Sequence, residues 1–210
     1  MNAAQDATTV LLSQCTPQAW RNGGGTTREM LAWNGREPLA SAAAQWLLRV
    51  SVADIDADGP FSRFEGIDRR FAVLEGEGVE LIIAGRERII QRGDPPTAFA
   101  GEVEVGCRLL SGSTRDLNLM VRRSAGSAVM SRAIPGSGFG AGLSWRAVFT
   151  FSPARLACAP DDTPVDLPAG SLFWSARAQP SWHLLEGEHA FWLGLRAPPV
   201  ASRLRGPGTR

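Results

Sequence analysis

Short runs of alternating apolar and polar residues, separated by turns that contain glycine or proline, recur along most of the chain. The clearest run spans residues 46–55, where one face carries Trp46, Leu48, Val50 and Val52 and the other carries Leu47, Arg49, Ser51 and Ala53. Such alternation is the period of a β-strand, because successive side chains of a strand point to opposite faces. Helical periodicity is almost absent, and short strands at this close spacing are typical of a β-sandwich or β-barrel. The pattern therefore predicts an all-β fold.

The strands form two similar series. Residues 79–94 and 155–174 each predict a strand, a turn and a second strand, followed by another turn. Two β units in tandem would account for a length of 210 residues. We therefore expect a first barrel over residues 8–125, a second barrel over residues 126–196, and disordered tails at residues 1–7 and 197–210.

A predicted loop of fifteen residues, Asp56–Arg70, interrupts the strands of the first half. Asp58-Gly59-Pro60 has the composition of a tight turn, and two nearby phenylalanines would anchor the loop. A loop of this length inside a domain is usually functional or disordered, and the aromatic residues favour order. We predict that Asp58, Asp68 and Arg69 form a structural latch that closes the loop, with a ligand contact as the alternative.

The second half differs in composition from the first. Residues 124–141 are rich in glycine, serine and alanine and are predicted to be a linker or a flexible surface loop. The strands that follow are largely apolar, with residues such as Phe173, Phe191 and Leu193 at alternate positions. We therefore expect the second half to contain a core with few polar groups available for chemistry.

The least ordinary stretch is Trp20–Glu29, in which an aromatic residue, three consecutive glycines and several polar side chains share ten positions. Consecutive glycines are tolerated where the backbone needs unusual dihedral angles or must approach another group closely. A phosphate-binding loop is excluded because the Walker pattern requires a lysine, and a dinucleotide fingerprint is excluded because its spacing is absent and a strand follows. Two interpretations remain: a purely structural turn, or a turn that presents Asn22, Thr26 and Glu29 to a small polar ligand.

The composition narrows the classes of function. The 22 basic residues, all arginine, nearly balance 21 acidic ones, so the net charge of +1 favours neither nucleic acid nor an anionic membrane as a partner. The absence of lysine excludes Schiff-base chemistry and leaves arginine as the strong cationic receptor for anions. The 3 cysteines are widely spaced and fit neither a disulfide framework nor a metal knuckle. Without a signal-peptide pattern or an apolar stretch of about 20 residues, we expect a cytoplasmic protein.

Several motifs follow one another along the first half of the chain: Trp20–Glu29, Arg49–Ala53, Asp58–Ser62, Asp68-Arg69 and Asp116–Met120. Together they resemble the HutD/Ves family of cupin-like proteins. The resemblance implies a bicupin, with two double-stranded β-helix (jelly-roll) barrels in one compact chain, which agrees with the tandem β units. It also implies a bacterial, cytosolic protein linked to histidine utilisation, with no established enzymatic activity and a regulatory role through a pathway metabolite such as formylglutamate.

Cupins commonly hold a metal ion through several histidines and a carboxylate. This chain has only His183 and His189, both in the second half and in neither HxH nor HxxxH spacing. A metal site there would need acidic or cysteine ligands as well, and the alternative is a pair of histidines that flank a hairpin turn. We predict no metal and no cofactor. Neither histidine has the neighbours expected of a nucleophilic triad.

Two alternative functions stay open. Glu29, Asp58 and Asp68 could supply an acid-base pair for a metal-independent isomerase or hydrolase that acts on a histidine-pathway intermediate. A protein-interaction module would instead show an exposed apolar patch and no pocket.

The favoured hypothesis is a metal-free protein that binds a small, anionic, carboxylate-bearing metabolite in its first barrel. Arg49 and Arg122 would hold the carboxylate, because a guanidinium matches its geometry through two parallel hydrogen bonds; an ordinary surface position is the alternative for Arg49. Asn118 and Thr26 would orient the rest of the ligand. The predicted ligand-binding residues are Asn22, Thr26, Glu29, Arg49, Ser51, Phe61, Ser62, Asn118 and Arg122. The identity of the ligand and the oligomeric state, including a homodimer, stay open.

Overall fold

The computed structural model describes residues 6–39, 45–159, 162–177 and 180–198. Within these ranges the chain forms β-strands and a few short 3-10 turns but no α-helix. The fold is therefore all-β, as the alternating pattern predicted. No helix in this part of the chain is long and apolar enough to cross a lipid bilayer. The tails predicted at residues 1–7 and 197–210 fall mostly on residues 1–5 and 199–210, which lie outside the described residues.

Two antiparallel sheets build the first barrel. The first large sheet has the strand order β2 (Pro17–Ala19), β3 (Gly25–Trp33), β4 (Leu48–Ile55), β11 (Thr114–Arg122), β6 (Ile67–Glu75) and β9 (Thr97–Ala100). The first small sheet has the order β5 (Gly59–Pro60), β10 (Val105–Leu109), β7 (Val79–Ile83) and β8 (Arg86–Ile90). Residues from both sheets share one apolar cluster, which shows that the two sheets face each other.

Two further antiparallel sheets build the second barrel. The second large sheet has the order β1 (Thr8–Leu11), β17 (Ser171–Ser175), β14 (Trp145–Thr150), β19 (Ala190–Arg196) and β12 (Ser127–Ala133). The second small sheet has the order β13 (Gly138–Phe139), β18 (Trp182–Gly187), β15 (Ala154–Ala157) and β16 (Val165–Leu167). Their facing sides also share an apolar cluster.

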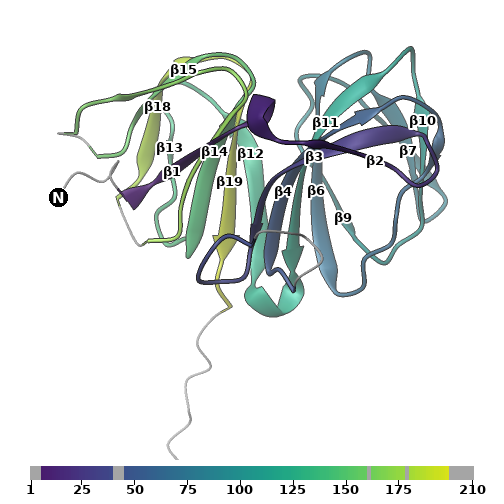
Figure 1. The fold of residues 1–210 in the computed structure, drawn as a ribbon, viewed down its shortest axis with the longest axis horizontal. Coiled ribbons are helices and arrows are strands. Elements are labelled where there is room, and N and C mark those ends of the chain that lie inside the picture. The colour runs from purple at the N-terminus through teal and green to yellow at the C-terminus, as the bar shows by residue number, and fades with distance from the viewer. Residues whose placement is uncertain (1–5, 40–44, 160–161, 178–179, 199–210) are drawn as a thin grey trace, which may run out of the picture.

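The two large sheets pack against each other in the middle of the molecule. Figure 1 shows the two groups of strands side by side, with β3, β4 and β11 next to β12 and β19. The largest apolar cluster joins them: Val50, Leu117 and Leu119 of the first large sheet meet Ala147 and Leu193 of the second. Each large sheet is therefore buried on both faces, one in the shared core and one in its own barrel. Two barrels in one compact chain are the arrangement of a bicupin.

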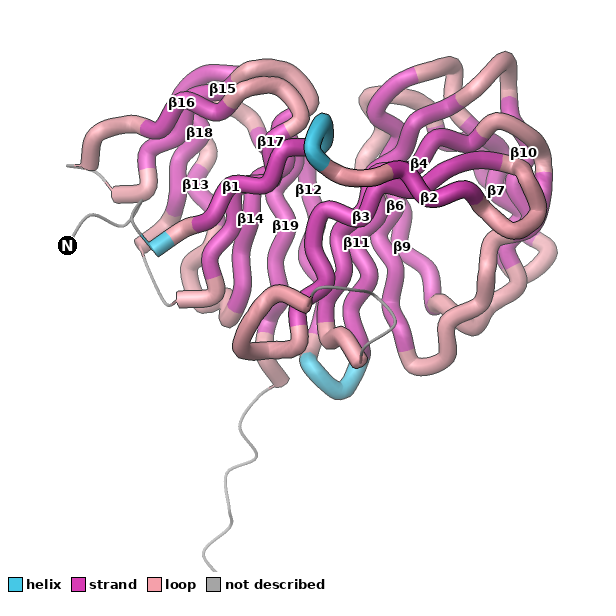
Figure 2. The backbone as a smooth tube through the Cα atoms, in the orientation of Figure 1, coloured by secondary structure: helices cyan, strands magenta, loops and turns pink. Residues whose placement is uncertain are grey.

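The first strand belongs to the second barrel, which corrects the predicted boundary at residue 8. Strand β1 pairs with β17 from Thr8↔Trp174 to Leu11↔Ser171, and the chain then passes through a 3-10 turn, Leu12–Gln14 (η2), into β2 of the first barrel. Figure 2 shows this segment running across both barrels. Strand β1 covers an edge of β17 that would otherwise be exposed. The β1–β17 pairing therefore prevents that edge from pairing with another chain.

Residues 124–141 are not a linker. Strand β12 pairs with β19 over seven residues, from Ser127↔Arg196 to Ala133↔Ala190, and contributes Ala128 and Met130 to the shared core. Further on, the ring of Phe139 stacks on Trp192 with a centroid distance of 5.2 Å. Of the small residues that suggested flexibility, Ala128, Ala133 and Gly140 are buried, because small side chains allow close approach between neighbouring segments.

Candidate ligand-binding site

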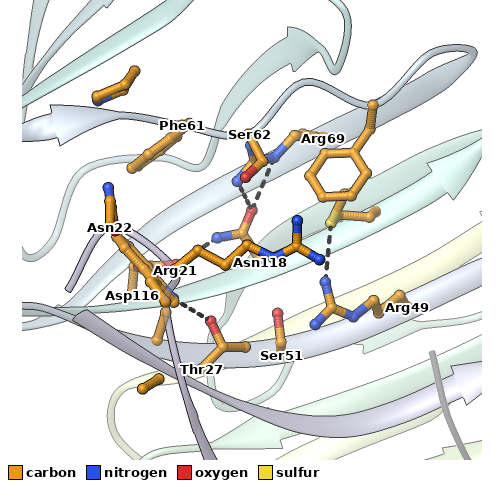
Figure 3. Close-up of a pocket in the computed structure, with 16 residues that line it drawn as sticks. Arg21, Asn22, Thr27, Arg49, Ser51, Phe61, Ser62, Arg69, Asp116 and Asn118 are labelled. Atoms are coloured by element: carbon orange, nitrogen blue, oxygen red, sulfur yellow. Dashed lines mark hydrogen bonds between the residues drawn. The ribbon is translucent and has the colours of Figure 1, made fainter. Parts of the chain in front are cut away.

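A cavity of about 630 Å³ lies in the first barrel, within the size range of pockets for small molecules. Figure 3 shows the residues that surround it. They come from the first large sheet, from the turn between β2 and β3, and from the loop before β6. The lining residues are Ala19, Trp20, Arg21, Asn22, Thr27, Arg49, Ser51, Ala53, Pro60, Phe61, Ser62, Phe64, Arg69, Asp116, Asn118 and Met120.

Strand register brings the polar side chains together on the inner face of the first large sheet. Met120 of β11 lies opposite Arg49 of β4 on one side and Arg69 of β6 on the other, so these three form one row across the sheet. In the next row Asn118 lies opposite Ser51. Directly opposed residues in an antiparallel pair have Cβ atoms about 4.5–5.5 Å apart, close enough to interact. The opposite faces of β4 and β11 are apolar and lie in the shared core.

Arg49 is held at the edge of the cavity by Glu29. Its Nε donates to Glu29 Oε2 at 2.7 Å, and its Nη1 lies 3.9 Å from the sulfur of Met120. Both charged side chains are largely buried, with 16% and 14% of their side-chain surface exposed. Within the described residues the Nη2 group of Arg49 has no hydrogen-bond partner. The ion pair therefore fixes the guanidinium and leaves donors directed to the cavity, which suits an anionic ligand.

Arg69 is buried in the same cavity and surrounded by aromatic rings. Its guanidinium carbon lies 5.0 Å from the ring centroid of Phe61, 5.0 Å from that of Phe99 and 5.9 Å from that of Phe64. Burial lowers the pKa of Arg69 to about 10, so the group still carries its charge at neutral pH. The aromatic faces offset part of the desolvation through cation-π contacts.

Asn118 connects Arg69 to a buried carboxyl group. Its Oδ1 accepts hydrogen bonds from Nη2 and Nε of Arg69 at 2.9 and 3.3 Å, and its Nδ2 donates to Asp116 Oδ1 at 2.5 Å. Only 1% of Asp116 is exposed. Burial raises the pKa of Asp116 to about 7, against the opposing effects of Arg69 and of the Asn118 hydrogen bond. The cavity floor thus holds a carboxyl group that changes its charge near neutral pH.

The glycine run forms the tight turn between β2 and β3 at the rim of the cavity. Gly23 has a φ of +72°, a conformation that favours glycine. A Cβ on Gly25 would lie 2.2 Å from the carbonyl oxygen of Asp54, so this position excludes any side chain. The backbone N–H of Gly24 donates to Asn22 Oδ1 at 3.1 Å, which closes the turn. Unusual dihedral angles and close approach both account for the run, as its composition predicted.

Aromatic residues form the apolar wall of the cavity. The Nε1 of Trp20 donates to Thr27 Oγ1 at 2.8 Å, which fixes the indole beside the turn. Its ring makes an edge contact with Phe61, at a centroid distance of 6.4 Å, and Phe61 in turn packs on Phe71. The cavity therefore combines a polar floor with an apolar side, as small-molecule sites commonly do.

The structure places most of the predicted ligand-binding residues around this one cavity. Six of the nine line it, namely Asn22, Arg49, Ser51, Phe61, Ser62 and Asn118. Glu29 does not line the cavity but holds Arg49. Thr26 points elsewhere, toward Asp54, with Oγ1 3.5 Å from Oδ2. Arg122 lies at the far end of β11 and donates to the carbonyl of Trp46 at 3.3 Å. The predicted Arg49–Arg122 clamp is therefore wrong in its second member.

The predicted loop latch needs a similar correction. Strand β6 already begins at Ile67, so the loop is shorter than expected and Asp68 and Arg69 belong to a strand. Asp58 ties the loop to β10, because its Oδ1 accepts a hydrogen bond from the backbone N–H of Leu109 at 2.8 Å. Asp68 pairs with Arg123 at 2.8 Å. Arg69 is not part of a latch, because alternation along β6 points it inward, to the cavity.

Several lining residues were not predicted. Asp116 shares a strand face with Asn118, and Thr27 lies two residues before Glu29, so alternation from these two predicted residues could have selected both. Arg21 extends from the glycine turn across the cavity toward the side where Arg49 lies (Figure 3). No pattern in a turn predicts that direction, because it depends on how β2 and β3 meet.

The side chains around the cavity do not suit a metal ion. The lining set offers a single carboxyl group beside the guanidinium groups of Arg21, Arg49 and Arg69, and no histidine. Divalent cations are bound by several anionic or neutral donors, and positive charges nearby oppose them. In the part of the chain that the structure describes, no group of three or more His, Cys, Asp or Glu residues is arranged to hold a metal.

Comparison with known protein families shows which family the chain belongs to. The sequence model of the HutD family matches residues 12–191. The chain belongs to the HutD family. An uncharacterised 21.2 kDa protein from the hutC 3' region of Pseudomonas putida is 41% identical over 101 residues, which cover 48% of this chain and 50% of that protein. Protein Ves of Citrobacter koseri is 37% identical over 105 residues, which cover 50% and 52%. The chain spans about half the length of the curated relatives it matches.

Solved structures of other proteins have folds similar to that of this chain. A conserved protein of unknown function from Pseudomonas aeruginosa PAO1 shares 25% identity with a TM-score of 0.77, over 90% of this chain and 97% of that one. HutD from Pseudomonas fluorescens SBW25 shares 23% identity with the same TM-score of 0.77, over 91% and 99%. An oxalate decarboxylase mutant from Bacillus subtilis, at 9% identity and a TM-score of 0.59 over 90% and 77%, shares only the fold. These similarities support the bicupin architecture, and HutD membership associates the chain with histidine utilisation.

Proposed function

We propose that the first barrel of this HutD-family protein binds a small metabolite through a carboxylate group, and that this binding serves regulation in histidine utilisation. One observation carries the proposal: the guanidinium groups of Arg21, Arg49 and Arg69 line a single cavity that also has an aromatic wall. Such a cavity favours a small organic anion, because guanidinium groups match carboxylates and the aromatic rings accommodate a short carbon chain.

The arginines have different roles in this proposal. Arg49 is the main carboxylate receptor, because Glu29 fixes it while its Nη2 group faces the cavity. Arg21 is exposed at the rim and would close over the bound anion. Arg69 has its Nε and Nη2 engaged by Asn118 and contributes mainly positive potential.

The chemistry of the ligand follows from this arrangement. A formylglutamate-like metabolite meets the requirements, since it combines carboxylates with a polar acyl group that Ser51 or Asn118 could orient. The structure of HutD from Pseudomonas fluorescens is described for a formate condition, and formate is the smallest carboxylate. Membership of the HutD family is what associates the chain with histidine utilisation. The regulatory role is part of our proposal.

Thermal stabilisation by carboxylates tests the proposal. A ligand that binds only the folded protein raises its melting temperature in proportion to the logarithm of its concentration over Kd. We expect formylglutamate to raise the melting temperature of the parent protein and to leave that of Arg49→Ala unchanged, while the two unliganded proteins melt within a few degrees of each other. Arg155→Ala, an exposed change in the second barrel, is the matched control and should respond like the parent. Equal ligand shifts in the parent and in Arg49→Ala would contradict the proposed role of Arg49.

A second candidate, metal-independent catalysis, is favoured by one observation. Asp116 is a buried carboxyl group in the cavity with a pKa near 7, a property common among general acids and bases. Turnover of a histidine-pathway intermediate without added metal, and its loss in Asp116→Asn, would establish this function. Binding without any turnover would leave the binding protein as the better account.

A further inference from the structure

Asp116 is placed where a binding protein for anions would be expected to have no acid. It lines the cavity with 1% of its surface exposed, and the cavity is the same one that the arginines line. A fixed negative charge here would repel a bound carboxylate in a medium of low dielectric constant, where such repulsion is strong. The site therefore needs a way to remove the charge when the anion is present.

The hydrogen bonds around Asp116 allow a proton to be added. Asn118 donates to Oδ1, and within the described residues Oδ2 has no hydrogen-bond partner. Asn118 keeps its orientation in either state, because its Oδ1 is held by Arg69. A proton on Oδ2 would therefore leave the network intact and give the cavity floor a hydrogen-bond donor for the ligand.

The groups that face Asp116 from other strands do not provide a neutralising ion pair. Arg69 on β6 attracts the carboxylate but acts through Asn118, and no salt bridge joins Arg69 to Asp116 within the described residues. Asp54 on β4 lies on the other face of the sheet, paired with Arg28 and Arg115, and its negative charge raises the pKa of Asp116. Cys107 on β10 stays a neutral thiol, because burial, Asp116 and Asp58 raise its pKa to about 12. Arg49 adds positive charge to the cavity but is paired with Glu29.

We propose that the cavity takes up one proton from solvent with each carboxylate that it binds, and that the proton resides on Asp116 Oδ2. The proton balance is simple: the ligand arrives as an anion, Asp116 changes from carboxylate to carboxylic acid, and no bond of the ligand breaks. Asp116 thereby becomes a specificity-determining residue, since the site accepts a carboxylate at the pH at which Asp116 can be neutral. Proton uptake depends on the proposed function, because it requires that an anion binds.

Acetate is a suitable probe because it stays ionised between pH 6 and 8.5. Its Kd is measured across this range by tryptophan fluorescence at constant ionic strength, with Trp20 at the cavity wall as the reporter. Because Asp116 titrates near pH 7, we expect Kd to rise about thirtyfold from pH 6 to 8.5, approaching tenfold per pH unit. Calorimetry in two buffers of different ionisation enthalpy should give an uptake of about half a proton at pH 7 and about one at pH 8.5.

Two variants complete the test. Asp116→Asn keeps the shape of the side chain and an oxygen that can accept the hydrogen bond from Asn118. The Kd of this variant for acetate should be nearly independent of pH, and acetate binding should take up no proton. Asp166→Asn, in an exposed position of the second barrel, should behave like the parent. The calorimetric measurement needs only the parent, so a folding defect in Asp116→Asn would not prevent a decision.

The outcomes separate the two proposals. Acetate binding with a constant Kd and no proton uptake in the parent would overturn the role of Asp116 and leave the carboxylate site in place. Proton uptake that persists in Asp116→Asn would also overturn it, because another group would then be the acceptor. A parent that binds neither acetate nor formylglutamate at any pH would overturn the proposed function itself.

Discussion

Both barrels carry an arginine that points inward from a strand of the large sheet, yet the two side chains have opposite surroundings. Arg49 on β4 faces an open cavity in the first barrel. Arg146 on β14 is 1% exposed in the second, where Nη1 and Nη2 donate to the carbonyls of Pro180 and Arg177 at 2.7 and 3.0 Å. The donors of an inward arginine are therefore open to a cavity only where neighbouring backbone has not already occupied them.

The reason lies in what covers each arginine. In the second barrel a Cβ on Gly140 would lie 2.8 Å from the side chain of Arg146, so backbone passes directly over it. The ring of Trp182 lies against the guanidinium, with 5.6 Å from its carbon to the ring centroid. In the first barrel, the corresponding space is lined by Ser51, Asn118 and Asp116. The same fold thus supports one packed interior and one open cavity.

The largest expected effect tests the packed interior. Trp182 is fully buried, and its ring packs on Phe173 at a centroid distance of 5.0 Å. Trp182→Ala should lower the free energy of unfolding by about 3–5 kcal/mol, because a large core side chain is replaced by a cavity. Urea denaturation measures this, and acetate binding by the folded variant should stay within about twofold of the parent. A loss below about 1 kcal/mol would show that this interior is loosely packed.

The two arginines provide the direct comparison. Arg146→Ala should lower the free energy of unfolding by about 2–3 kcal/mol, since the carbonyls of Pro180 and Arg177 lose charged donors and the buried side chain no longer packs against Trp182. Arg49→Ala should lower it by a smaller amount, about 1–2 kcal/mol, because one ion pair is broken and the carboxylate of Glu29, with 14% of its side chain exposed, loses its charged donor. Parallel denaturation curves give both values. A greater loss for Arg49→Ala than for Arg146→Ala would reverse the assignment of receptor and structural side chain.

The last expected effect, smaller than that of Arg146→Ala, concerns the pH dependence of stability. The folded protein holds the proton of Asp116 up to about pH 7, whereas the unfolded chain releases it near pH 4. Asp116 therefore contributes stability below pH 4 that is lost as the pH rises to 7. At pH 8 the free energy of unfolding of Asp116→Asn should exceed that of the parent by about 1–2 kcal/mol. This gain is reduced because the variant also loses the attraction between the Asp116 carboxylate and Arg69. At pH 4 the two proteins should be similarly stable. Equal stability curves at both pH values would contradict burial of this charge.

Much of the candidate site could be predicted because strand alternation and turn composition are local properties. Arg49 and Ser51 share a strand face by their spacing, and the glycine run requires a tight turn wherever it lies. Prediction failed for Arg122 and Arg69, which satisfy similar patterns. Arg122 is inward by alternation but reaches a backbone carbonyl at the strand end, whereas Arg69 enters the cavity because β6 pairs with β11 in the required register.

The sequence by itself determined that the chain is all-β, that it repeats a β unit, that the turn at Gly23–Gly25 is tight and that the second half is apolar, since these features depend on neighbours along the chain. Only the tertiary structure decided that β1 pairs within the second barrel, that the small residues near Gly140 cover Arg146, and that Asp116 is buried beside Asn118. The physical reason is that the charge, burial and hydrogen bonding of a side chain depend on segments that are distant in sequence. In this protein those distant segments left the inward arginine of one barrel facing a cavity and covered that of the other.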